Sequence, residues 1–278
     1  MKDNLYLPDL ITKHGLRRGL SHRTIKTYRQ CIKKFFSTCN KHPLEVNKKD
    51  IHDYLDNLIQ KGAGGNTINV YLNSLRFLYF DVFNKKFMVR IRFSKTPKTL
   101  PTVLTKEEVK RLINAIDNTK HKLIVKLLYS AGLRVSELVN LKICDLELDK
   151  NYGWVRHGKG DKDRLFIIAK TIKYELISYI TDENLTSESW LFEGTKYNHL
   201  SVASVKMIIK KAARKAKIAK NVHHHTLRHS FATHLIENEY DVLSVQSLLG
   251  HSKADTTMTY LHMASPKMIN VKSPIDDL

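Results

Sequence analysis

The chain has 278 residues, enough for two domains with buried cores. Hydrophobic residues make up 42% of it and charged residues 27%, which excludes a fibrous repeat and wholesale disorder. Lysine and arginine total 47 against 27 aspartate and glutamate residues, and the net charge of +20 predicts a polyanionic partner. Nucleic acid is the first expectation, and an anionic membrane surface is the alternative.

The cysteine and hydropathy patterns are typical of a protein inside the cell. Cys31, Cys39 and Cys144 form no CxxC pair and no even set of disulfide partners. There is no apolar run of about 18 residues, and charged side chains occupy the first twenty residues, where a signal peptide needs an apolar stretch. We therefore expect a cytoplasmic protein that does not span a membrane.

Residues 1–92 are predicted to form a helical bundle. One helix is expected within the first twenty residues, and a second follows the N-cap Ser21 with apolar residues at intervals of three and four. Further helices are expected over residues 47–61 and after Gly64. Basic residues lie between the apolar positions of the second helix, and its DNA-binding candidates are Arg23, Lys26, Arg29 and Lys33.

Residues 93–101 are predicted to be an extended linker, because they contain two prolines and two lysines without a periodic apolar face. Thr105 and Glu108 then form a capping box at the start of a helix. A second domain is placed at residues 102–264, followed by a tail at residues 265–278.

This second domain is expected to be mostly helical with one β region. Two apolar stretches within residues 145–168 flank a glycine-bracketed turn, which predicts a hairpin. The apolar periodicity predicts helices over residues 171–180, 202–218, 227–238 and 242–249. The helix over residues 202–218 carries a basic face, whose DNA-binding candidates are Lys206, Lys210, Lys211 and Arg214.

Four short stretches stand out, although each has an ordinary structural explanation by itself. In AGLRVSEL, Arg134 follows Gly132 where a helix restarts, and a surface ion pair with Glu137 is the simple interpretation. In the turn HGKGDKD, Lys159 has glycines on both sides, which leave the cationic arm free to reach a ligand and donate a proton. Most turn lysines are only solvated.

The stretch HHHTLRHSFATHL carries histidines and an arginine at the start of a helix. His225 and Arg228 are three residues apart, so they share a face and can point at one phosphate near the helix N-terminus. Residues 223–225 are consecutive and cannot all face one ion, and no suitable cysteine or carboxylate pair flanks them. We expect no metal site here, and a packing or capping role for His229 and His234.

The stretch LLGHSKADTTMTYLH ends a helix at Gly250 and runs through His251 to Tyr260. A lone tyrosine near a helix end is usually a packing residue. In order and spacing, however, the four stretches together resemble the signature of the tyrosine recombinases, also called phage-integrase-type recombinases. The resemblance spans residues 105–260, and the basic helical region before it is similar to the core-binding domain of that family.

The resemblance implies a mainly helical fold with a small β-hairpin or sheet. It implies a two-domain DNA clamp, in which an N-terminal core-binding bundle precedes a C-terminal catalytic domain. The short chain looks most like the Xer-type recombinases and the simple mobile-element integrases. The partners implied are double-stranded DNA and further copies of the chain, assembled as a tetramer on two duplexes.

The resemblance also implies the chemistry. Recombinases of this family cut one DNA strand by attack of a tyrosine oxygen, which leaves a 3′-phosphotyrosine and a free 5′-hydroxyl, and another strand reverses the step. Tyr260 would be the nucleophile, and Arg134 and Arg228 would clamp the phosphate. Lys159 would protonate the leaving oxygen. His225 would help to deprotonate the tyrosine or hold the phosphate.

The remaining implied roles belong to His251, which would donate a hydrogen bond to a non-bridging oxygen, and to Glu137, which would orient its neighbours. No cofactor is expected, because the bond energy stays in the covalent link and two guanidiniums neutralise the phosphate. Chromosome dimer resolution and mobile-element integration both fit, as do delivery of Tyr260 within one protomer and between protomers. The alternatives are a type IB topoisomerase and a non-catalytic DNA-binding protein of the same fold.

Overall fold

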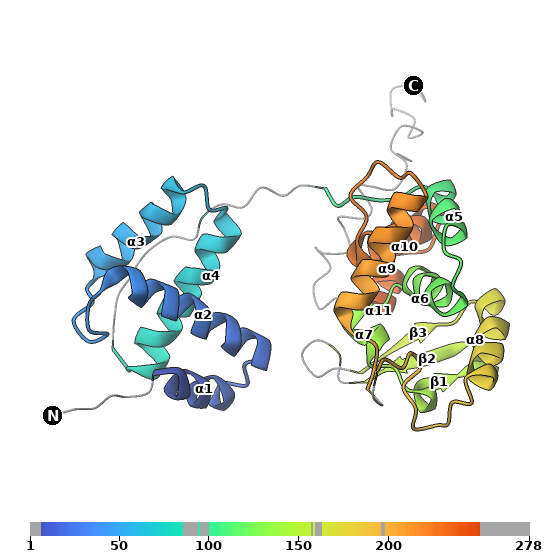
Figure 1. Ribbon diagram of the computed structural model, residues 1–278, viewed down its shortest axis with the longest axis horizontal. Helices are drawn as coiled ribbons and strands as arrows, with labels where there is room; N and C mark the ends of the chain where they lie inside the picture. The colour runs from blue at the N-terminus through green and yellow to red at the C-terminus, as the bar shows by residue number, and fades with distance from the viewer. Residues whose placement is uncertain are drawn as a thin grey trace, which may run out of the picture. The chain divides into compact units, whose positions relative to one another are not determined.

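A computed structural model describes residues 7–85, 94, 100–156, 158, 163–195 and 198–250 (Figure 1). The chain divides into two compact units, residues 1–98 and 99–278, and each has a hydrophobic core of its own. Within the described ranges, no helix has the length and apolar character needed to cross a bilayer.

The first unit is a bundle of α1 (Leu7–Arg17), α2 (His22–Cys39), α3 (Lys48–Gln60) and α4 (Gly65–Arg76), and α4 continues into a π-helical segment, Phe77–Val82. The predicted caps form: the Ser21 hydroxyl accepts from the Thr24 backbone N–H at 3.1 Å. The apolar face of α2 supplies Ile25, Ile32 and Phe35 to the core, so the basic residues between them stay outside.

The second unit begins with α5 (Lys106–Asn114), α6 (Thr119–Ser130) and the short α7 (Val135–Val139). An antiparallel sheet follows in the order β1 (Leu146–Glu147), β2 (Tyr152–Val155) and β3 (Arg164–Ile167), in which Val155 pairs with Arg164 and Gly153 with Phe166. The chain then forms α8 (Lys170–Asp182), α9 (Val202–Lys215), α10 (His224–Glu237) and α11 (Val242–Leu249). The predicted mainly helical fold with a small sheet is confirmed.

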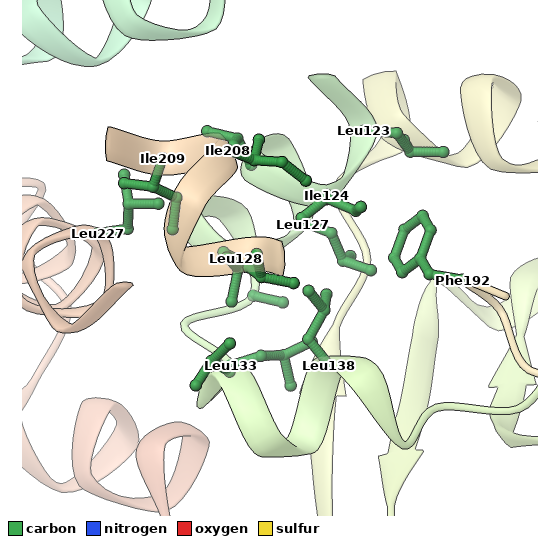
Figure 2. Packing of buried hydrophobic residues seen from close by; sticks show 14 of the residues in the cluster. Leu123, Ile124, Leu127, Leu128, Leu133, Leu138, Phe192, Ile208, Ile209 and Leu227 are labelled. Atoms are coloured by element: carbon green, nitrogen blue, oxygen red, sulfur yellow. The ribbon is translucent and has the colours of Figure 1, made fainter. Parts of the chain in front are cut away.

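Helix α6 lies at the centre of this unit and contacts α7, α8, α9 and α10. Five of its residues are buried: Leu123, Ile124, Val125, Leu127 and Leu128. Figure 2 shows side chains of this helix packed among Phe192, Ile208, Ile209 and Leu227. Because α6 is buried on several sides, its C-terminal end is a rigid base for the turn that follows it.

Two helix boundaries differ from the predicted ones by three residues. α10 starts at His224 instead of Leu227, because Nδ1 of His223 accepts a hydrogen bond from the Thr226 backbone N–H at 3.2 Å and caps the helix three residues earlier. α9 ends at Lys215 instead of Ile218, because Lys217 adopts a left-handed conformation with φ of 52°. His225 and Arg228 therefore both lie in the first turns of α10.

Candidate active site

A tight turn after α6 places Arg134 at the start of α7. Gly132 has φ of +57°, and a Cβ added there would lie 2.4 Å from Cδ1 of Phe231, so both the backbone conformation and the close approach of α10 require glycine. Arg134 then takes the N-cap position with an extended backbone. Its side chain is 21% exposed, which leaves it on the accessible side of the turn.

Glu137 binds Arg134 twice. Its Oε2 accepts from the Arg134 backbone N–H at 2.8 Å, and its Oε1 accepts from Nη1 of Arg134 at 2.6 Å. The predicted i+3 pair therefore forms, but the Glu137 side chain is 5% exposed and the pair is not an ordinary surface contact. Burial raises the pKa of Glu137, but the charges of Arg164 and Arg134 and the backbone hydrogen bond outweigh it, so the pKa lies below its usual range.

Arg228 projects from the first turns of α10 into the protein and is 3% exposed. Its Nη1 donates to the carbonyl of Gly132, and its Nη2 donates to the carbonyl of Leu249. The guanidinium therefore joins the turn that carries Arg134 to the last residue of α11. Two fixed acceptors orient a planar group that has five N–H donors.

His225 lies one helical turn before Arg228 and is in electrostatic range of both arginines. Partial desolvation lowers the pKa of His225, and electrostatic interactions with His223, Arg228, Arg134 and Lys206 lower it further. The imidazole is therefore neutral at neutral pH. A neutral ring can accept a proton, which is the property that a general base needs.

The neighbouring histidines are also held neutral. Burial and nearby positive groups lower the pKa of His224 to about 4 and that of His229 to about 4. Nδ1 of His234 lies 2.8 Å from the Tyr129 hydroxyl, and the buried ring packs against that tyrosine. Across the part of the chain that the structure describes, no group of three or more histidine, cysteine, aspartate or glutamate side chains could hold a metal ion.

The basic face of α9 adjoins this cluster. Lys206 and Lys210 line a pocket of about 410 Å³ together with residues 221–225 at the start of α10. Arg214 continues the same face at four-residue spacing and is exposed. Lys211 points to another side of α9, where it lines a pocket near Asp117.

In the first unit, the DNA-binding candidates are exposed on one face of α2. Arg23, Lys26, Arg29 and Lys33 are separated by three, three and four residues, and within the described ranges no carboxylate pairs with them. The last three line a pocket of about 850 Å³ beside α1. Four adjacent cations without counter-charges form an electropositive surface.

The structure thus brings Arg134, Glu137, His225 and Arg228 together at the junction of α7, α10 and α11. Lys159, His251 and Tyr260 lie outside the described residues, as do the tail at residues 265–278 and most of the predicted linker.

Arg164 is a member of this cluster that the sequence interpretation missed. Its Nη2 donates to Oε2 of Glu137 at 2.6 Å. The strand pattern of the sequence could have indicated this residue. Side chains alternate along a strand, so Arg164 lies on the same face as Phe166, which is fully buried. A cation on a buried face needs a carboxylate partner.

Known proteins resemble this chain over most of its length. Residues 102–266 match the phage integrase family, and residues 10–88 match the phage integrase N-terminal SAM-like domain. The chain is 37% identical over 246 residues to the tyrosine recombinase XerA of Pyrococcus horikoshii, with 87% of this chain and 84% of that protein covered. It is 32% identical over 272 residues to XerD of Staphylococcus haemolyticus, with 91% and 92% covered.

Solved structures show the same fold. The crystal structure of a XerA recombinase matches with a TM-score of 0.56 at 30% identity and covers 96% of both chains. The XerH site-specific recombinase, in a post-cleavage complex with its palindromic difH substrate, matches with a TM-score of 0.74 at 24% identity over 91% of this chain and 80% of that one. The chain therefore belongs to the phage integrase family of tyrosine recombinases.

Proposed function

We propose that this enzyme is a site-specific recombinase that cuts and rejoins double-stranded DNA through a 3′-phosphotyrosine link at Tyr260. The observation that carries the proposal is the junction at which Arg134, His225 and Arg228 meet, on a chain whose relatives are tyrosine recombinases. Positive groups fixed by buried hydrogen bonds stabilise charge as it develops on a phosphate, because they need no reorganisation during the reaction.

The two arginines that bind the phosphate are held in different ways. Arg228 is held by two carbonyls and presents a fixed guanidinium, and Arg134 is held by Glu137 on the accessible side of its turn. Together they neutralise the non-bridging oxygens in the way that magnesium does in other phosphoryl-transfer enzymes. We therefore expect strand cleavage to persist in EDTA.

The proton transfers belong to three other side chains. His225 is neutral, so it accepts the proton of the attacking Tyr260 hydroxyl. Lys159 donates a proton to the leaving 5′-oxygen, and His251 donates a hydrogen bond to a non-bridging oxygen; these assignments rest on the family signature. The 5′-hydroxyl of a second strand then attacks the phosphotyrosine and releases the enzyme.

DNA binding is shared between two electropositive surfaces. The face of α9 with Lys206, Lys210 and Arg214 reaches the edge of the catalytic cluster, so it is placed to hold the backbone beside the scissile phosphate. The face of α2 is the corresponding surface of the first unit. Complexes of the XerH recombinase with difH DNA support this role for the fold.

Strand exchange between two duplexes requires four cleavage events, so the working form is a tetramer of this chain on two DNA sites. Because its substrate is DNA, we expect the enzyme to act in the cytoplasm. A type IB topoisomerase differs by relaxing supercoiled DNA without paired sites.

The decisive experiment traps the covalent intermediate. Purified enzyme is incubated with a nicked duplex from which the short 5′-hydroxyl fragment diffuses away after cleavage. We expect a covalent adduct with the wild type and none with Tyr260→Phe, which lacks only the attacking oxygen and keeps its affinity for the duplex. An adduct with Tyr260→Phe would overturn the assignment. Sequencing the trapped DNA identifies the target site.

A further inference from the structure

Arg164 is a charged residue that is largely shielded from solvent inside the catalytic unit. Its side chain is 10% exposed, and it begins β3 on the strand face that also carries Phe166. Its cross-strand partner Val155 is 2% exposed. A surface ion pair therefore does not explain this arginine, and its contacts must account for the cost of burying a guanidinium.

These contacts connect three separate elements. Nη2 of Arg164 donates to Oε2 of Glu137 on α7 at 2.6 Å. Nη1 donates to the carbonyl of Leu248 on α11 at 2.5 Å and to the carbonyl of Leu165 at 3.2 Å. The guanidinium thus bridges the carboxylate of Glu137 and the end of α11. Its planar shape with several N–H donors allows it to bind both at once.

The first connection controls Arg134. Glu137 holds the Arg134 side chain with Oε1, and it shares Oε2 between Arg164 and the Arg134 backbone N–H. The direction of the Arg134 guanidinium therefore depends on where Glu137 sits, and Arg164 fixes Glu137 from the opposite side. The neighbouring guanidiniums also keep this buried carboxyl ionised, because they lower its pKa.

The second connection controls the end of α11. Arg164 binds the carbonyl of Leu248, and Arg228 binds the carbonyl of the next residue, Leu249. Gly250 follows with φ of +61°, and a Cβ added there would lie 2.6 Å from Cδ of Arg164. The chain thus leaves α11 directly against Arg164, and the next residue is His251.

We propose that Arg164 is a positioning residue for DNA cleavage, which holds Glu137 against Arg134 and fixes the end of α11 that leads to His251. This role rests on the proposed cleavage reaction. Displacing a reacting group by about 1 Å can cost about 10²-fold in rate. A buried ion pair, by contrast, adds little net stability compared with apolar packing, so catalysis is the property that the contact serves.

The test replaces Arg164 by lysine. Arg164→Lys keeps the positive charge, but an ammonium cannot reproduce the fork that spans Glu137 and Leu248. With the nicked duplex at saturating concentration, we expect the rate constant for adduct formation to fall about 10²-fold. The dissociation constant of uncleaved duplex should stay near the wild-type value. A wild-type cleavage rate in this variant would overturn the proposal.

A second substrate separates positioning from general damage to the fold. A methylphosphonate at the scissile position replaces a charged non-bridging oxygen by a methyl group, so its cleavage depends less on the arginine clamp. We expect the defect of Arg164→Lys to be about tenfold smaller on this substrate than on the phosphodiester. Equal defects on both substrates would mean that Arg164 supports only the fold.

A matched control is available just after the neighbouring strand. Arg156 follows β2, is 48% exposed, and pairs with Asp163 at 2.9 Å and with Asp145, so it lies outside the Glu137 network. Arg156→Lys should cleave like the wild type, and a loss equal to that of Arg164→Lys would overturn the specific role.

Glu137→Gln provides a second variant of the same connection, because it keeps the side-chain volume and removes the charge. If Arg164→Lys fails to fold, Glu137→Gln takes its place and is expected to show the same substrate-dependent defect. A Glu137→Gln variant without that defect would overturn the proposal. A wild-type protein that forms no adduct would overturn the proposed function itself. If the wild type forms the adduct and Arg164→Lys forms it at the same rate, only the positioning role is overturned.

Discussion

Arg228 donates a hydrogen bond to the carbonyl of Leu249, the last residue of α11, although the two residues lie on different helices. The same guanidinium also donates to the carbonyl of Gly132. One side chain therefore fixes both the turn that presents Arg134 and the helix end that precedes His251. This relationship links the stability of the catalytic unit to the geometry of its active site.

Replacing Arg228 is expected to affect both properties. Arg228→Ala removes a phosphate ligand, which should slow adduct formation by about 10² to 10³-fold. It also leaves two buried carbonyls without a donor, at a cost on the order of 1 to 3 kcal/mol for each in unfolding free energy. Single-turnover cleavage and chemical denaturation measure the two effects. Arg134→Ala is the comparison: it should slow cleavage to a similar extent and destabilise the protein less, because Arg134 is partly exposed.

Lys159 can be tested by changing the leaving group. A substrate with sulfur in place of the 5′-bridging oxygen releases a thiolate, which leaves without needing a proton. Lys159→Ala should therefore be strongly impaired on the normal duplex and close to wild type on the sulfur substrate. Equal impairment on both substrates would exclude Lys159 as the general acid.

The acid sensitivity of the fold should depend on the half-buried His229. The pKa of His229 is about 4 in the folded protein, below the ordinary value of 6.5 for histidine. Between these values the unfolded chain binds more protons, so the unfolding free energy falls as the pH is lowered from 6.5 towards 4. This group contributes on the order of 2 to 3 kcal/mol to the loss.

Chemical denaturation of the wild type and of His229→Asn across this pH range measures the contribution. The difference in unfolding free energy between the two proteins should be constant above pH 6.5 and should shift in favour of the variant below it. Parallel pH profiles would show that His229 is not held neutral by the fold.

Gly132 should not tolerate a side chain. Gly132→Ala combines the strain of a left-handed backbone, roughly 1 to 2 kcal/mol, with a clash against Phe231, and it displaces the turn that carries Arg134. Gly19→Ala is the control, because Gly19 has φ of +67° with no atom within 4 Å of an added Cβ. Circular dichroism during denaturation should show a larger loss for Gly132→Ala, and equal losses would mean that α10 can move away.

The basic face of α9 predicts the salt dependence of DNA binding. Lys206→Ala and Lys210→Ala should each weaken binding to any duplex sequence and lower the slope of log affinity against log salt concentration by about 1. Lys215→Ala, on the same helix, is the control, because its ammonium lies 2.6 Å from the Asp117 carboxylate and is already neutralised. Equal slopes for the wild type and the Lys206 and Lys210 variants would place the DNA on another surface.

Local patterns in the sequence determined much of this protein. The spacing of Ile25, Ile32 and Phe35 fixes α2, and the Thr105–Glu108 capping box starts α5, because helix periodicity and capping involve residues a few positions apart. The glycine-bracketed turn between two apolar stretches marks the β2–β3 hairpin in the same way. The catalytic signature is also a matter of order and spacing along the chain, so the family could be recognised before any geometry was known.

The tertiary structure alone decided which groups meet. Arg228 binds carbonyls of residues 132 and 249, and Arg164 binds Glu137 and residue 248; all four partners are far away in the sequence. Three of these four acceptors are backbone carbonyls, which every residue possesses, so the residue types at these positions do not reveal the contacts. The neutral state of His225 also depends on the tertiary structure. Its lowered pKa results from partial desolvation and from the positive charges that lie near the ring in the folded protein.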